Sequence, residues 1–410
     1  MPRHSILVVS DAHFFNPQFY ANVADGHTAL NPPSRLSTEL ALGDRKANPF
    51  HALVELARSG SLTVETLVCC GDLTTCADPT AMNLGWLQLH RLANELGVEA
   101  PIITAGNHDI DSRFQISSTN PQRMLRYLDP RFPTSDASAE ASYWSNGYCV
   151  IDRGDARFVL ANTCSLHGYA TEADRQLDHG SIPEELISRL PQDLADREER
   201  SLNFFVCHHH PVEIDVPAED QSVIDNGTIL VAMLEDLSPP PWVVIHGHRH
   251  LPGLRYATAS PASPVIFSAG SLAANLHMRL QGRTANQFYL LEVEHADGLT
   301  LGRYRAWTWD QHEGEWLEGQ DTRALSSTGG FGYRPDVVAA AATIAPLVPD
   351  HAQGAITWGE VEAALPKIRF VIEEEKRMIV EALSSHGVQW ETDNGRLELA
   401  SGRLRLGRTA

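Results

Sequence analysis

The chain has 410 residues, of which 43% are hydrophobic and 20% are charged, a composition typical of a globular protein with a substantial core. Its formal net charge of −20 at pH 7 argues against non-specific binding to a nucleic-acid backbone unless a local basic cleft is present. No apolar run reaches the roughly 18 residues needed to span a bilayer, and we therefore expect no membrane association.

The beginning of the chain and its cysteines bear on the compartment. Only four consecutive apolar residues, Ile6 to Val9, occur near the N-terminus, which is too few for the core of a signal peptide. The six cysteines show no C-x-x-C spacing, and we interpret them as reduced thiols. Both features predict a cytoplasmic protein.

A short apolar run followed directly by metal-capable residues recurs five times along the chain. The runs are ILVVSDAH (6–13), TLVCCGD (66–72), PIITAGNHD (101–109), FFVCHHHP (204–211) and WVVIHGHRH (242–250). Apolar spacing between them predicts helices over 48–60, 83–97 and 226–237, the first with Asn48 as N-cap and Pro49 in its first turn. Strands that alternate with helices predict buried parallel strands. Ligands bind beyond the carboxyl ends of such strands, which is where all five clusters fall.

Other stretches have the pattern of antiparallel strands. They cover residues 147–152, 156–163, 264–271, 286–294 and 300–309. Their placement predicts a second sheet packed on the first, with helices outside. The expected fold class is therefore α/β, a two-sheet αββα sandwich.

Two long connections, 14–47 and 110–146, show little periodicity apart from a short predicted helix at 121–128. Loops of this length in a compact domain often serve as lids over a site, although surface padding is the alternative.

The character of the sequence changes after the glycine-rich stretch 327–332. TWGE (357–360) has the pattern of a capping box, and an apolar face predicts a helix over 367–387. The last segment, VQWETDNGRLELA, predicts a hairpin with an Asn-Gly turn. We therefore predict two units: a main domain over 1–330 and a small α+β module over 331–410, with two helices and a hairpin in the manner of a winged helix. Nine Lys and Arg against eleven Asp and Glu leave 333–410 almost neutral, so the main domain carries most of the negative charge.

Seven residues at the five strand ends are candidate metal ligands: Asp11, His13, Asp72, Asn107, His209, His248 and His250. Asp11 and His13 lie two residues apart across a strand terminus and can turn toward one ion. Asp72 has two carboxylate oxygens and can bridge two cations. Mixed oxygen and nitrogen ligands suit two divalent transition-metal ions, namely Mn, Fe, Zn or Ni. Two ions that share Asp72 would stabilise the attacking and the leaving oxygen in an in-line phosphoryl displacement.

The ordered set DAH, GD, GNHD, HHHP and GHRH resembles the calcineurin-like metallophosphoesterases, over roughly residues 4–306. The resemblance implies a phosphoester hydrolase with a binuclear metal centre. It assigns Asp11, His13, Asp72 and His250 to the first ion, and Asp72, Asn107, His209 and His248 to the second. Within the HHH run, the family's His-x-Pro pattern selects His209. Strand alternation would point His208 and His210 to the opposite side.

The same resemblance implies a catalytic role for His108, the family's non-ligand histidine beside the substrate. A hydroxide that bridges the metals would attack phosphorus, while His108 stabilises the developing charge or protonates the leaving alkoxide. Asp109 is expected to orient His108, and a helix N-cap is the alternative reading of this residue. Purple acid phosphatases carry a metal-binding tyrosine three residues after the GD aspartate. This chain has Thr75 there, which argues against that branch.

The arrangement of ligands is similar to that of the bacterial class III cyclic nucleotide phosphodiesterases. It predicts a phosphodiesterase that acts on a small phosphoester, such as a cyclic nucleotide or a glycerophosphodiester, with Arg35, Arg45 or Arg113 near the phosphate. The alternatives are a phosphomonoesterase, a nuclease whose module over 331–410 binds nucleic acid or a protein partner, and a non-enzymatic scaffold. The acidic composition weighs against nucleic acid, and the complete ligand set weighs against a scaffold.

Overall fold

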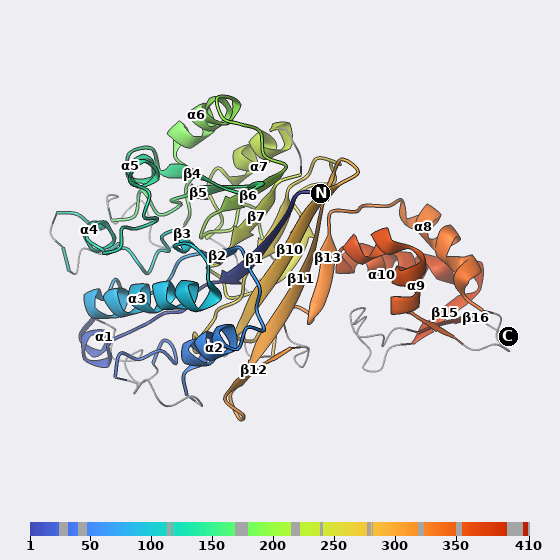
Figure 1. The fold of residues 1–410 in the computed structure, drawn as a ribbon, viewed down its shortest axis with the longest axis horizontal. Coiled ribbons are helices and arrows are strands. Elements are labelled where there is room, and N and C mark those ends of the chain that lie inside the picture. Colours follow the sequence, from blue (N-terminus) through green and yellow to red (C-terminus); the bar gives the residue numbers. More distant parts are fainter. Residues whose placement is uncertain are drawn as a thin grey trace.

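The computed structural model describes residues 1–23, 32–39, 47–112, 116–117, 119–168, 179–214, 222–237, 241–276, 280, 282–318, 324–349, 355–391 and 405–408. Within these residues, two large sheets lie face to face with helices on their outer sides (Figure 1). A smaller body of helices with a sheet of its own extends from one side of this sandwich. The predicted αββα architecture is confirmed.

The first large sheet combines parallel and antiparallel strands, in the order β12-β11-β10-β1-β2-β3, with β13 paired to β11. Strand β1 runs parallel to β2 and antiparallel to β10. The strands are β1 (Arg3–Val9), β2 (Thr66–Cys69), β3 (Ile102–Ile103), β10 (Gln287–Ala296), β11 (Leu299–Asp310), β12 (Glu315–Glu318) and β13 (Thr328–Phe331).

The second large sheet has the order β4-β5-β6-β7-β9-β8. Strands β5, β6, β7 and β9 are parallel, while β4 and β8 pair antiparallel at the two edges. The strands are β4 (Tyr148–Arg153), β5 (Ala156–Ala161), β6 (Leu202–Val206), β7 (Val243–His246), β8 (Gly253–Tyr256) and β9 (Val265–Ser268).

The prediction that the five cluster-bearing strands form one sheet and the antiparallel stretches another is wrong. Strands β1, β2 and β3 belong to the first sheet, whereas β6 and β7 belong to the second. Periodicity along a strand reports which faces are buried, and it does not identify the neighbouring strand. The five carboxyl ends still meet, because the two sheets present them at the same end of the sandwich.

Helices cover both outer faces of the sandwich (Figure 1). Helices α2 (Pro49–Arg58) and α3 (Pro79–Leu96) lie over the first sheet, and α6 (Glu184–Ala195) and α7 (Gly227–Asp236) lie over the second. The predicted cap of α2 is confirmed, since the Asn48 side chain accepts the His51 backbone N–H. Helix α3 starts four residues earlier than predicted because the Asp78 carboxylate caps it at Thr80 and Ala81.

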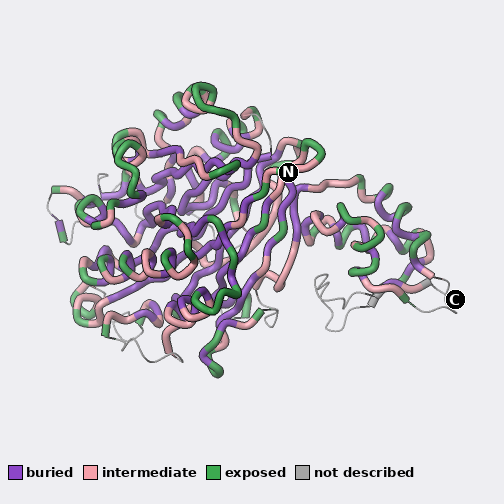
Figure 2. The backbone as a smooth tube through the Cα atoms, viewed as in Figure 1, coloured by how far each residue is buried: buried purple, intermediate pink, exposed green. Residues whose placement is uncertain are grey.

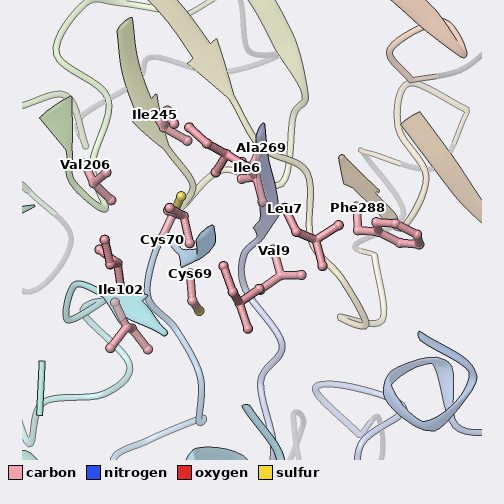
Figure 3. Close-up of a cluster of buried hydrophobic side chains, with 14 of the residues drawn as sticks. Ile6, Leu7, Val9, Cys69, Cys70, Ile102, Val206, Ile245, Ala269 and Phe288 are labelled. Carbon is pink, nitrogen blue, oxygen red and sulfur yellow. The ribbon is translucent and has the colours of Figure 1, made fainter. Parts of the chain in front are cut away.

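The strands around the middle of the sandwich are buried on both faces (Figure 2). In β6, Phe204 and Val206 belong to the apolar layer between the sheets, while Phe205 packs with α6 and α7. Figure 3 shows part of the inner layer, where Ile6, Ile245 and other apolar side chains crowd around Cys69 and Cys70. This packing fixes the ends of the strands, and therefore the side chains that follow them.

Both long connections contain structure. Helix α1 (Pro17–Val23) lies in the first, and α4 (Arg123–Arg126) and α5 (Ala137–Asn146) lie in the second. The helix predicted at 121–128 corresponds to α4 and is shorter. Residues 24–31, 40–46, 113–115 and 118 of these connections are outside the described residues.

The C-terminal part has a hydrophobic core of its own, which includes Trp358, Val361, Ile379 and Leu406. Its elements are α8 (Val337–Ile344), a 3-10 helix (Ala345–Leu347), β14 (Ile356–Thr357), α9 (Trp358–Ala364), a 3-10 helix (Pro366–Phe370), α10 (Glu373–Ala382), a 3-10 helix (Leu383–His386), β15 (Val388–Glu391) and β16 (Arg405–Arg408). These strands form a three-stranded sheet in the order β14-β16-β15. The predicted capping box is confirmed by the reciprocal bonds of Thr357 and Glu360. Residues 392–404, which include the predicted Asn-Gly turn, lie outside the described part of the chain.

The prediction of a single helix over 367–387 is wrong. The chain forms a 3-10 turn, becomes extended at Val371 and Ile372, and only then enters α10. Contacts with the sandwich explain the break: the Phe370 carbonyl accepts the Tyr333 N–H, and a Cβ on Gly330 would lie 1.9 Å from the Arg369 carbonyl oxygen. Packing against β13 therefore overrides the local helical pattern.

Arg334 joins the C-terminal part to the sandwich. Its guanidinium lies 4.1 Å from the centroid of the Tyr256 ring, donates to the Ser260 carbonyl, and forms an ion pair with Glu375 of α10 at 3.1 Å.

Among the described residues, the helices are either too short or too polar to span a bilayer.

Candidate metal centre

The loops that follow β1, β2, β3, β6 and β7 meet at one end of the sandwich and are bonded to one another. The Asp11 N–H donates to the Gly71 carbonyl at 3.0 Å, which joins the first two loops. Across the sandwich, Nδ1 of His208 lies 2.7 Å from the Cys70 carbonyl oxygen, and the His248 N–H donates to the Asp11 carboxylate at 3.2 Å. The five clusters are therefore brought together from two sheets.

The backbone is strained where these side chains gather. Eight non-glycine residues among those described have a positive φ: Asp11, His13, Asp72, Cys76, Ala77, His248, His250 and Asp297. Five of the eight are candidate ligands predicted from the sequence. Left-handed conformations are unfavourable for residues with a Cβ, and they persist where the surrounding structure requires them, often at functional sites.

Glycines allow the loops to approach one another. A Cβ on Gly106 would lie 2.1 Å from Oδ1 of Asp72, and a Cβ on Gly247 would lie 2.0 Å from Oγ of Ser10 and 2.5 Å from Oδ2 of Asp11. Any side chain at these two positions would displace a candidate ligand. The glycines of GNHD and GHRH are thus explained by close packing around the two aspartates.

One group of donor atoms contains Asp11, His13 and His250. Nε2 of His250 lies 3.3 Å from Oδ1 of Asp11 and 3.2 Å from Nε2 of His13. Nε2 of His13 also lies 3.7 Å from Oδ2 of Asp72. Ligand atoms about 2.0–2.2 Å from one ion lie roughly 3–3.5 Å from each other, so this spacing suits a single ion.

A second group lies directly beside the first and contains Asn107, His208 and His248. Nε2 of His208 lies 3.1 Å from Oδ1 of Asn107, 3.2 Å from Nδ1 of His248 and 3.3 Å from Oδ2 of Asp72. Nδ1 of His248 lies 3.1 Å from Oδ1 of Asn107. These atoms have the spacing of ligands around one ion.

Ligand atoms of His208, of His248 and of His209, the residue that the sequence pattern selected, lie within 4.8 Å of one another. His208 also lies at ligand spacing from Asn107 and Asp72. The alternation of side chains along a strand does not apply to the three histidines, because β6 ends at Val206 and the histidines follow it. Nδ1 of His209 instead lies 2.8 Å from the Thr163 hydroxyl. Nδ1 of His208 faces the Cys70 carbonyl, and such an outer partner on the second nitrogen is typical of a metal-ligating histidine.

Asp72 stands between the two groups. Its Oδ2 is close to both His13 and His208, whereas Oδ1 accepts the His108 backbone N–H at 2.8 Å. The side chain is only 2% exposed, and that of Asp11 is fully buried. Two buried carboxylates amid four imidazoles are costly unless cations compensate them.

The charge states of the histidines also suit metal binding. Burial lowers the pKa of His13 to about 3 and holds the pKa of His248 well below its usual value. Burial would also lower the pKa of His208, but the Asp72 carboxylate outweighs it and raises that pKa to about 9. A cation in the second group would replace this proton, because imidazole binds metals in its neutral form. The residues present therefore fit two ions.

The remaining histidine of VIHGHRH does not join the site. His246 is the last residue of β7, fully buried, and burial lowers its pKa to about 3.

The two predicted catalytic residues have different surroundings. The His108 ring is half-buried and lies beside that of His13, with 5.1 Å between the ring centroids. The prediction that Asp109 orients the His108 ring is not what the structure shows, because the two Asp109 oxygens accept the N–H groups of Thr74 and Gly106. Among the described residues, no helix begins directly after Asp109, so it is not seen to act as an N-cap either. It holds the GNHD loop against the GD loop, and burial raises its pKa to about 7.

Of the three arginines proposed for the phosphate, Arg35 donates to Gln311, while Arg45 and Arg113 lie outside the described residues.

Sequence reasoning missed the outer partner of His13. Oγ1 of Thr75 lies 3.0 Å from Nδ1 of His13 and is buried. The sequence identified Thr75 only as the residue that stands where a tyrosine would bind metal. In the structure Thr75 contacts a candidate ligand, and it orients the ring of His13.

We expect Thr75→Val to weaken metal binding by about 10- to 100-fold, since outer partners of ligating histidines contribute by this factor. Equilibrium dialysis against Mn²⁺ measures the affinity. Thr74→Val is the matched control, because Thr74 is equally buried but donates to the Phe14 carbonyl. Equal Mn²⁺ affinities in the two variants would show that the contact between Thr75 and His13 does not contribute to metal binding.

Comparison with known proteins gives one family match. The model of the calcineurin-like phosphoesterase family matches residues 4–269. No curated protein matches the sequence at a significant level.

Several solved structures are similar to this chain at low sequence identity. A purple acid phosphatase from yellow lupin (Lupinus luteus) seeds is 12% identical, with 81% of this chain and 54% of that chain covered and a TM-score of 0.46. The chain thus spans about half the length of that phosphatase. A structure of PhoD is 9% identical, with 81% and 70% covered and a TM-score of 0.44. The NAD nucleotidase of Haemophilus influenzae is 13% identical, with 78% and 54% covered and a TM-score of 0.36.

Proposed function

The chain belongs to the calcineurin-like phosphoesterase family, and on this premise we propose that it is a dinuclear metal-dependent phosphodiesterase that acts on a small substrate. The observation that carries the proposal is the convergence of two donor groups on one oxygen of Asp72. We assign Asp11, His13, Asp72 and His250 to one ion. We assign Asp72, Asn107, His208 and His248 to the other, with His208 in place of His209.

Two divalent ions, when bound by these residues, would polarise a phosphoryl oxygen and lower the pKa of a water molecule at the site. The protein holds the ligands rigidly, through the Asp72 bond to the His108 N–H and the Asp109 bonds to Thr74 and Gly106. The mixed oxygen and nitrogen donors suit Mn, Fe, Zn or Ni, as the sequence predicted.

A small diester suits the charge of the protein. The chain carries a net charge of −20, and a phosphodiester brings one negative charge where a monoester near neutral pH brings close to two. The same charge disfavours a long polyanion. Helix α10 of the C-terminal part begins with Glu373, Glu374 and Glu375, which also weighs against a nucleic-acid surface there.

We infer that His108, whose ring lies beside that of His13, moves a proton at the leaving oxygen. We expect His108→Ala to reduce kcat by about 10²- to 10⁴-fold for a diester with an alkyl leaving group, the usual effect of removing a general acid. The loss should be much smaller for a p-nitrophenyl ester, because p-nitrophenolate leaves without protonation. Metal content should not change. Equal losses on both esters would contradict proton transfer and favour stabilisation of charge on the phosphoryl group.

The proposal is tested by a substrate panel assayed with Mn²⁺, Fe²⁺, Zn²⁺ and Ni²⁺. The panel contains bis-(p-nitrophenyl) phosphate, cyclic nucleotides, glycerophosphodiesters, matching monoesters and single-stranded DNA. We expect hydrolysis of small diesters, with no activity in Asp72→Ala. A preference for monoesters or DNA would overturn the proposed substrate, and inactivity on every ester with both ions bound would overturn the proposed reaction.

A further inference from the structure

A pocket of about 370 Å³ lies between the first turns of α3 and helix α4, beside the segment that follows the GNHD loop (Figure 1). Its lining contains none of the proposed metal ligands. We propose that this pocket binds the nucleobase of the substrate, so that the small diester is a nucleoside phosphodiester. The inference rests on the proposed function and narrows its substrate class.

The pocket is joined to the candidate metal centre by short stretches of chain. Pro79 lines the pocket, and two residues before it the Ala77 N–H donates to the His108 carbonyl at 2.8 Å. Asp111 also lines the pocket and follows His108 by three residues, which span at most about 11 Å. A nucleoside joined to a phosphate at the centre extends over such a distance, so its base would reach the pocket.

The lining combines buried apolar side chains with an exposed aromatic ring. Met82 and Leu128 are buried, whereas Tyr127 is 78% exposed. A tyrosine with that exposure adds little to the hydrophobic core, so the fold alone does not account for its ring at this place. Methionine and tyrosine side chains make favourable contacts with a flat aromatic ring, and such stacking depends little on which base is present.

Arg123 adds a positive charge to the pocket. Its guanidinium lies 5.7 Å from the centroid of the Tyr127 ring, and it forms no ion pair with any of the described residues. A guanidinium plane stacks on nucleobases as a tyrosine ring does. Its charge also attracts an anionic ligand to a chain whose net charge is −20.

Polar groups in the lining favour a nucleobase over an alkyl chain or a glycerol. The Asn83 amide nitrogen donates to the Pro79 carbonyl at 2.9 Å, which leaves the amide oxygen for a second group. Side-chain amides pair with the polar edges of bases. An alkyl chain would use neither Asn83 nor Arg123, and a glycerol group is not flat and would gain nothing from stacking on Tyr127.

The experiment compares two diesters with the same leaving group, thymidine 5′-(p-nitrophenyl phosphate) and methyl p-nitrophenyl phosphate, on the full chain loaded with Mn²⁺. We expect a KM at least about fivefold lower for the thymidine ester, because stacking of one base contributes a factor of about 5 to 150. Tyr127→Ala should raise KM for the thymidine ester alone and leave kcat unchanged. Tyr127→Phe keeps the ring and should behave as the wild type.

Leu87→Ala is the matched control, because Leu87 is an exposed apolar residue of α3 outside the pocket lining. It should leave KM for both esters unchanged. Equal KM values for the two esters in the wild type would overturn the proposal, and so would a Tyr127→Ala variant that changes KM for both esters alike.

Binding of thymidine to the inactive Asp72→Asn variant separates the pocket from the proposed function. An NMR titration should show saturable binding, weakened at least about fivefold when Tyr127→Ala is added. If the wild type hydrolyses neither ester while thymidine still binds in this way, the proposed reaction fails and the pocket is confirmed. Absence of thymidine binding, or binding that does not depend on Tyr127, would overturn the pocket whatever the activity.

Discussion

Replacement of Asp72 by Asn should abolish almost all activity while the fold is kept. Asn has the same shape, tolerates the left-handed backbone of Asp72 at a φ of 51°, and can still accept the His108 N–H through Oδ1. It lacks the charged oxygen that lies close to both His13 and His208. Metal ions supply several kcal/mol of transition-state stabilisation, so kcat/KM should fall by about 10³-fold or more.

The matched control is Asp297→Asn. Asp297 also has a positive φ, of 54°, but its side chain is exposed and paired with Lys367. This variant should keep full activity and both ions. If Asp72→Asn kept its activity together with two bound ions, Asp72 would not be the shared ligand.

Substitution of His208 and of its neighbour should give opposite results with Mn²⁺. His208→Gln removes the Nε2 that faces Asn107, His248 and Asp72, and should lower the affinity for the second ion by at least about 100-fold. His209→Gln should retain both Mn²⁺ ions, because the contacts to Asn107 and Asp72 are those of His208.

Mn²⁺ binding isotherms measure the affinity, and thermal unfolding shows whether each variant folds. Loss of the second ion in His209→Gln, with retention in His208→Gln, would show that His209 is the ligand, as the His-x-Pro pattern predicts. If neither variant lost the second Mn²⁺ ion, neither His208 nor His209 would be a required ligand of the centre.

The chemistry of the site was readable from the sequence because each candidate ligand stands at the end of a strand. Asp11, Asp72 and Asn107 follow apolar runs that the core buries, and burial of those runs fixes where the next residues emerge. Six of the seven predicted ligands lie in the two donor groups or between them, and the seventh, His209, has a ligand atom within 4.8 Å of those of His208 and His248. The predicted family and fold class are confirmed.

What failed depended on contacts between segments. Which of His208 and His209 faces Asp72 depends on where β6 stops and on a bond to the Cys70 carbonyl in the other sheet. The role of Asp109 depends on the N–H groups of a neighbouring loop. The sheet to which β10 belongs depends on its pairing with β1, and the break before α10 depends on β13. No local pattern carries this information.

The account rests on two cations that share Asp72, and anomalous diffraction from crystals loaded with Mn²⁺ tests it most directly. We predict two peaks roughly 3.5–4 Å apart, as in other two-metal sites, both within bonding distance of the Asp72 carboxylate. One peak should lie next to His13 and His250, and the other next to His208 and His248. A single peak, or two peaks that do not share Asp72, would contradict the account.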